Sequence, residues 1–180
     1  MNPRSLHTDS VPSHDLTPTA VESETFSCTA QAVWSYRLDF ANLPDYNPDV
    51  SGVERVQDGD GVGGILGSGA RYRFNLTDPR RPGSSQPVEL WIVDVEEPVM
   101  VAAEMLGGNE AYEEFMVESH PDGCRATLSL WVTLPDGLDA ATLQRATAGS
   151  RAQIRKELDL MKDVLEGREG RIGEGNVGGG

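Results

Sequence analysis

Two carboxylates stand where they could do chemistry inside a folded domain. Asp94 and Glu113 each lie in a run of alternating apolar and polar residues, a pattern typical of β-strands with one buried face. On one of two orientations of its strand, Asp94 enters a largely apolar cavity, with Glu113 near the mouth. A buried, unpaired carboxylate tends to acquire a raised pKa, as a general acid or base requires. The alternative is that both side chains meet water, since Asp94 lies close to the turn at Glu96.

The other reactive residue types are too scattered to form a familiar catalytic centre. The histidines are His7, His14 and His120, two in the N-terminal tail and one in a turn, which argues against a metal triad or a histidine base. Cys28 and Cys124 fit neither a disulfide framework nor a metal knuckle, so we expect buried thiols in a reducing compartment. The sequence therefore predicts neither a metal site nor a cofactor.

A glycine-rich segment, DGDGVGGILGSG, spans residues 58–69. It lacks the strand-loop-helix setting and the lysine of a phosphate-binding loop. Its predicted use is as a flexible lid over a cavity mouth, and the alternative is a plain hairpin connection.

Charge and hydropathy narrow the range of partners. The formal net charge is -14, and such an acidic surface repels phosphate backbones and anionic lipids, so nucleic acid is not an expected partner. The N-terminal residues are polar and no apolar run is long enough to cross a bilayer, which predicts a cytoplasmic protein without membrane insertion.

The 180 residues predict one domain with loose ends. Residues 1–17 are rich in Ser, Pro, His and Asp, and residues 167–180 are rich in glycine, so both are expected to be disordered tails around a domain at 18–166. The domain should begin with a strand and a short helix and then consist mainly of strands. The predicted strands are 20–28, 53–57, 70–78, 88–96, 99–106, 111–119 and 124–134, with helices at 30–40, around 46–48 and at 139–166.

Short turns join the later strands, which makes them antiparallel neighbours because a parallel crossover needs a dozen or more residues. The last helix should start at Asp139 as its N-cap and stop at Gly167. One stripe of this helix is expected to face the sheet: Leu143, Ser150, Ile154, Leu158, Met161 and Leu165.

Local motifs in residues 26–56 resemble those of the START-like, or SRPBCC, superfamily, which includes lipid-transfer domains and polyketide cyclases. The similar motifs are Val33-Trp34, Asp39-Phe40, Asn42-Leu43-Pro44 and, after the glycine-rich segment, Gly69-Ala70-Arg71-Tyr72. The resemblance implies an α+β helix-grip fold: a seven-stranded curved antiparallel sheet wrapped around a long C-terminal helix, with two short helices after strand 1.

A strongly bent sheet gripping one helix leaves a space between them, lined by alternate residues of each strand. The expected ligand-binding lining is Tyr72, Phe74, Leu90, Ile92, Phe115, Leu128 and Leu130. Strand 88–95 is ambiguous because both of its faces are apolar. Similarity to the family favours Leu90, Ile92 and Asp94 as the inward set.

The outward set would then be Trp91, Val93 and Val95, an apolar stripe suited to a homodimer. In the reversed orientation, Trp91 lines the cavity instead.

Cyclases of the superfamily carry an interior arginine, and here the resemblance fails. Asp94 takes that place, while Arg71 and Arg73 point outward, so the cavity is expected to be poor in oriented polar groups. Three hypotheses of function follow: a carrier or sensor of a small hydrophobic or amphipathic molecule (lipid- or polyketide-like), a polyketide cyclase/dehydratase-like enzyme, and a protein-interaction module without ligand.

Overall fold

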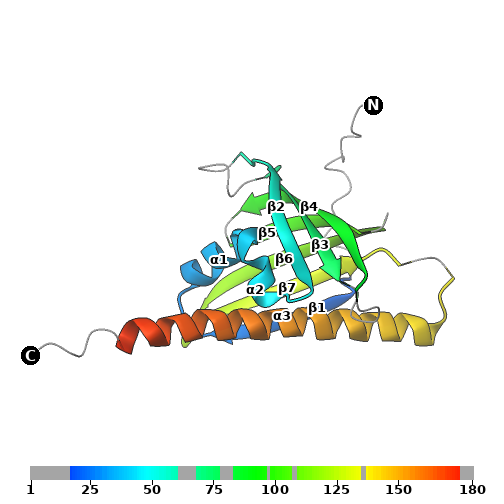
Figure 1. Ribbon diagram of the computed structural model, residues 1–180. Helices are drawn as coiled ribbons and strands as arrows, with labels where there is room; N and C mark the ends of the chain where they lie inside the picture. Colours follow the sequence, from blue (N-terminus) through cyan, green and yellow to red (C-terminus); the bar gives the residue numbers. More distant parts are fainter. Residues whose placement is uncertain are drawn as a thin grey trace, which may run out of the picture.

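A curved antiparallel sheet packs on one long helix in the computed structural model, which describes residues 17–60, 68–77, 83–96, 98–106, 109–134 and 137–174 (Figure 1). The strands lie in the order β1-β7-β6-β5-β4-β3-β2, so β1 and β7 are the one pair of described strands that are neighbours in the sheet but far apart in the sequence. This arrangement confirms the predicted helix-grip fold. The elements in chain order are β1 (Ala20–Phe26), α1 (Ala30–Leu38), η2 (Phe40–Asn42), α2 (Leu43–Tyr46), β2 (Val50–Gln57), β3 (Arg71–Thr77), β4 (Ser85–Glu96), β5 (Val99–Leu106), β6 (Asn109–His120), β7 (Gly123–Val132) and α3 (Ala140–Glu174).

Local capping residues set the three short helical segments that follow β1. The Thr29 hydroxyl accepts a hydrogen bond from the Ala32 amide at 3.2 Å and starts α1. Asp39 ends α1 and accepts from the Ala41 amide at 3.1 Å, which starts η2. Pro44 then lies in the first turn of α2, where a missing N–H costs nothing. The chain therefore folds back on itself over the sheet, and α2 reaches α3 (Figure 1).

The turn between β6 and β7 depends on a glycine. Gly123 has φ +132, and a Cβ there would lie 2.1 Å from the carbonyl oxygen of Phe26. Both the backbone conformation and the close approach exclude any other residue. This approach lets the chain leaving β1 pass directly beside the turn.

Alternation along the strands places the side chains as parity predicts on most of the sheet. Tyr72, Phe74, Leu90 and Ile92 are at most 3% exposed, whereas Arg73 is exposed. Phe115, Val117, Cys124 and the inward residues of β7 as far as Leu128 are buried in the same core. The orientation of β4 is therefore settled through Ile92.

Beyond Ile92 the parity prediction is wrong, because β4 contains a β-bulge. Ile92 pairs with Ala102 but Asp94 pairs with Val101, so the register shifts at Val93 and the two faces exchange. Asp94 is consequently exposed rather than in the cavity. Val95 turns inward and packs against the core.

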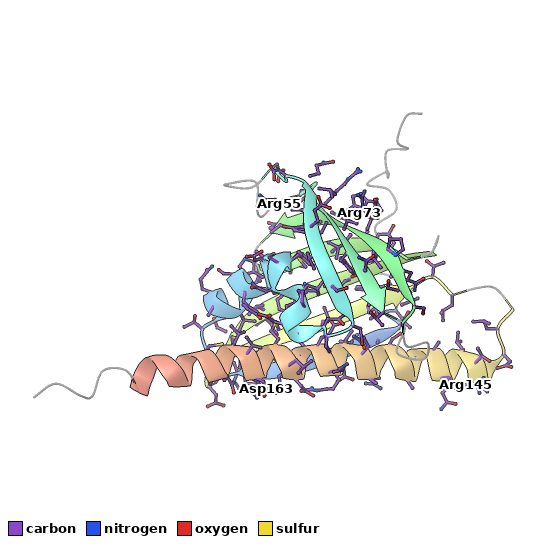
Figure 2. All side chains as sticks on the ribbon, in the orientation of Figure 1. Arg55, Arg73, Arg145 and Asp163 are labelled. Atoms are coloured by element: carbon purple, nitrogen blue, oxygen red, sulfur yellow. The ribbon has the colours of Figure 1, made fainter. Side chains whose placement is uncertain are left out.

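The final helix is longer than predicted. It continues through Gly167 to Glu174, because Gly167 does not adopt the left-handed conformation that would end the helix. A glycine inside a helix lowers its stability by only about 1 kcal/mol relative to alanine, so the helix can continue past it. Ile154, Leu158 and Met161 are at most 2% exposed, as the stripe predicts. For Leu143 the prediction is wrong, since this side chain is 46% exposed. Figure 2 shows Arg145 and Asp163 on the side of α3 that faces away from the sheet.

Some sequence expectations lie outside the described residues. These are His7, His14 and the centre of the glycine-rich segment, residues 61–67. Within the described ranges, no helix is long and apolar enough to span a membrane.

Candidate functional site

A cavity of about 310 Å³ lies between α3, the short helices and the concave side of the sheet. Its lining divides into two sets of side chains. The apolar set includes Phe40, Leu43, Val50, Phe74, Leu76 and Ile154. The polar set includes Arg37, Asn47, Glu104, Glu113, Gln153 and Glu157.

Arg37 is the central cation of the polar set. It follows Val33 by one turn of α1 and so shares the buried face of that helix, which leaves Arg37 only 2% exposed. Its guanidinium forms an ion pair with Glu113, which is 6% exposed, and donates to the Tyr46 hydroxyl at 3.1 Å. The Phe40 and Phe115 rings lie 4.9 and 5.5 Å from its central carbon, within cation–π range.

Electrostatics keep Arg37 charged despite its burial. Burial by itself lowers the pKa of Arg37, but the surrounding acidic groups, with Glu113 first, raise that pKa above its ordinary value. Burial raises the pKa of the Tyr46 hydroxyl, with Arg37 opposing the change. Arg37 is therefore a fixed positive charge with a bound counter-ion.

Glu157 is the second buried carboxyl group, presented by α3 one turn after Ile154. It is 9% exposed, and its Oε1 accepts from Asn47 Nδ2 at 2.8 Å and from Gln153 Nε2 at 2.9 Å. Burial, followed by the charge of Glu113, raises the pKa of Glu157 to about 7. The hydrogen bond from Gln153 and the charge of Arg37 lower this pKa, but by less. Near neutral pH this group can hold or release a proton.

Glu104 is the third carboxyl group and comes from β5. It is half-buried, lines the cavity, and has no hydrogen bond or ion pair with the described residues. Burial raises the pKa of Glu104 to about 8, and the neighbouring Glu113 and Glu157 act in the same direction. A proton held by Glu104 is thus available to a molecule in the cavity.

The structure brings together only part of the predicted lining. Phe74 and Leu130 line the cavity, and Phe115 and Leu128 border a separate void of about 10 Å³. Three further predicted residues are in the packed core: Tyr72, Leu90 and Ile92.

The short helices explain the difference. Phe40 packs with its ring centroid 5.0 Å from that of Tyr72, and Trp34 stacks on Phe115 at 6.5 Å. These two side chains fill the middle of the concave face, so the cavity is displaced toward α2 and α3.

The two carboxylate candidates have different places. Glu113 faces the interior as parity predicts, but it is paired with Arg37 rather than free. Asp94 lies on the outer face, beside Val99, Val101 and Glu114.

The expectation of an interior poor in oriented polar groups is wrong, because sequence reasoning missed Arg37, Glu104 and Glu157. Each has a detectable pattern. Arg37 and Glu157 stand at helical spacing among buried apolar residues, and Glu104 shares strand parity with Ala102, which is fully buried.

The outer face of β4 retains part of the predicted stripe. Trp91 and Val93 point outward, and the guanidinium of Arg71 lies 5.6 Å from the Trp91 ring centroid. Val95 is absent from this face because of the bulge. A homodimer through Trp91 and Val93 stays a prediction.

Comparisons with known proteins agree with this architecture. The di-domain ARO/CYC StfQ from the steffimycin biosynthetic pathway is similar with a TM-score of 0.66 and 12% identity, over 83% of this chain and 51% of StfQ. A START superfamily protein from Mycobacterium smegmatis is similar with a TM-score of 0.64 and 15% identity, over 82% of this chain and 96% of that chain. A protein from Thermus thermophilus is similar with a TM-score of 0.61 and 14% identity, over 83% of this chain and 97% of that chain.

At these identities the structural likeness shows the fold alone. No curated protein matches the sequence. The family described as "Polyketide cyclase / dehydrase and lipid transport" matches residues 17–166, which is nearly the whole described domain. The chain, with its START-like helix-grip fold, therefore belongs to the polyketide cyclase/dehydrase and lipid transport family.

Proposed function

We propose that this protein binds a small amphipathic molecule in the cavity between the sheet and α3, as a carrier or sensor. The observation that supports this most directly is the division of one cavity of about 310 Å³ into an apolar lining and a connected polar lining. Ligand sites of proteins combine mostly apolar walls with a few oriented polar groups in this way.

The cavity volume limits the size of the ligand. At ~30 Å³ per water molecule, the space equals about ten waters, which is at the small end of ligand sites. A compact amphiphile fits this space better than a long-chain lipid. Its apolar part would contact Phe74 and Ile154, and its polar end would meet the carboxyl groups.

Binding of 1-octanol to the full chain, measured by calorimetry and native mass spectrometry, tests the proposal. We expect one bound molecule per chain. Leu130→Trp fills the cavity from β7 and should weaken binding at least tenfold, while Leu143→Trp, on the exposed start of α3, should leave it unchanged.

Equal binding by both variants would place the ligand elsewhere. Absence of binding of 1-octanol, apolar dyes and other amphiphiles would instead favour a protein-interaction module without ligand.

A second candidate function is a polyketide cyclase/dehydratase-like enzyme, which the raised pKa values of Glu104 and Glu157 favour. Such groups can exchange protons with a carbonyl compound near neutral pH. The full chain would be incubated with a linear poly-β-ketone thioester and the products analysed by mass spectrometry. A cyclised or dehydrated product that Glu104→Gln no longer forms would support the enzyme, and unchanged recovery of the bound compound would support the carrier.

A further inference from the structure

The polar lining of the cavity carries more acidic groups than cations. Three glutamates line it, Glu104, Glu113 and Glu157, whereas Arg37 is the one guanidinium among the lining residues described. Asp49 also lines the cavity, but it faces Lys156, with 3.6 Å between Oδ2 and Nζ. Two of the three glutamates therefore lack a cation of their own.

We infer that the amphipathic ligand is a cation, a protonated amine whose ammonium group binds between Glu104 and Glu157 while its apolar part lies along Phe74 and Ile154. This inference rests on the proposed function and adds the chemical class of the ligand. An ammonium group offers three donors and requires acceptors, which these carboxylates supply.

Arg37 does not make the cavity a site for anions. Its guanidinium is already ion-paired with Glu113 and donates to the Tyr46 hydroxyl. An incoming carboxylate would have to displace Glu113 and would then face two further acidic side chains. A bound anion would hold Glu104 and Glu157 in their protonated, neutral form, so neither group would give it a balancing positive charge.

The Glu104 carboxyl group is available to accept hydrogen bonds from the ligand. It has no hydrogen bond or ion pair with the described residues although it lines the cavity. Glu157 contributes as well, because both of its described hydrogen bonds end on Oε1 and none on Oε2. A bare metal ion is a poorer fit, since no three His, Cys, Asp or Glu side chains of the described residues are arranged to hold one.

The protonation state of the two carboxyl groups provides a way to test the inference. The charged or titratable groups around Glu104 and Glu157 are Arg37, Tyr46, Asp49, Glu113 and Lys156. Burial favours the neutral form of both carboxyl groups when nothing balances their charge.

An ammonium ion binds the ionised carboxylate, so binding converts a carboxylic acid into a carboxylate and releases one proton to the buffer. Neither a neutral nor an anionic ligand has this effect.

Three eight-carbon probes that differ only in the head group test the inference: octylamine, 1-octanol and octanoate. Calorimetry of the full chain at pH 7, repeated in buffers of different ionisation enthalpy, gives both affinity and proton release. We expect octylamine to bind at least tenfold more tightly than the other two probes, with release of a proton.

Matched variants separate the site from the general field of an acidic protein. Glu104→Gln should weaken octylamine binding at least tenfold and 1-octanol binding much less, so that the preference for the amine is lost. Glu114→Gln, which makes the same substitution on the outer face of β6, should change the binding of neither probe.

Several results would overturn the inference. Octanoate or 1-octanol binding as tightly as octylamine would refute the cationic ligand while leaving the proposed function intact. An equal loss in Glu104→Gln and Glu114→Gln, or amine binding without proton release, would also refute it. If none of the three probes binds, the proposed function itself fails.

Discussion

Glu104→Gln is expected to change how the stability of this protein depends on pH. In the folded chain, burial raises the pKa of Glu104 from 4.5 to about 8. The folded state therefore holds a proton that the unfolded chain releases. The associated stability is fully present below about pH 4.5 and is lost as the pH rises toward 8.

The size of this effect follows from the two pKa values. One pH unit between them is worth ~1.4 kcal/mol, so Glu104 alone lowers the free energy of unfolding by about 3 kcal/mol between pH 5 and pH 8. The pKa of Glu157 is raised in the same direction, to about 7, and adds to the loss. Glutamine keeps the shape of the side chain without its charge, so Glu104→Gln should be more stable than wild type at pH 8 by up to about 3 kcal/mol.

Urea unfolding at several pH values between 5 and 8, followed by circular dichroism, measures this effect. Two-state fits with an unchanged m-value would show that the change is in stability. Glu114→Gln provides the control, because its side chain lies on the other face of the sheet and its pH profile should match wild type. A wild-type stability that is flat or rises from pH 5 to pH 8, or an equal slope in Glu104→Gln, would refute the reasoning.

Three further predictions concern the buried ion pair and two glycines. Arg37→Met should lower the free energy of unfolding by about 3–5 kcal/mol, because Glu113 stays buried without its partner. Adding Glu113→Leu to this variant should recover most of the lost stability. Urea unfolding of the two variants measures both effects, and a loss below ~1 kcal/mol in Arg37→Met would contradict a buried ion pair. Gly149→Ala should raise stability by about 0.5–1 kcal/mol, since the position is helical and a Cβ there has nothing within 4 Å. Gly123→Ala should lower the free energy of unfolding by more than about 2 kcal/mol, because the added Cβ would clash with the Phe26 carbonyl oxygen. Thermal unfolding compares the two glycine variants. A Gly123→Ala protein that is more stable than the Gly149→Ala protein would disprove the structural role given to each glycine.

Patterns along the sequence predict the elements of the fold, and the resemblance to the START-like superfamily predicts how they are arranged. Alternation of apolar and polar residues assigned the inward faces of β3, β6 and β7, and the 3.6-residue period assigned the buried stripe of α3 around Leu158. These properties are local, because they repeat along the chain with the period of one element. The short turns between consecutive later strands then require those strands to pair antiparallel.

Tertiary structure decided the site. A single shift of register at Val93 moved Asp94 from the expected cavity to the surface, and no residue type in that strand indicates a bulge. Arg37, Glu104 and Glu157 come from α1, β5 and α3, and only packing brings them together around one cavity. Periodicity can place a charged residue on the buried face of its own helix or strand. Its neighbours in space, however, come from elements far apart in the chain, and a local sequence pattern carries no information about those contacts.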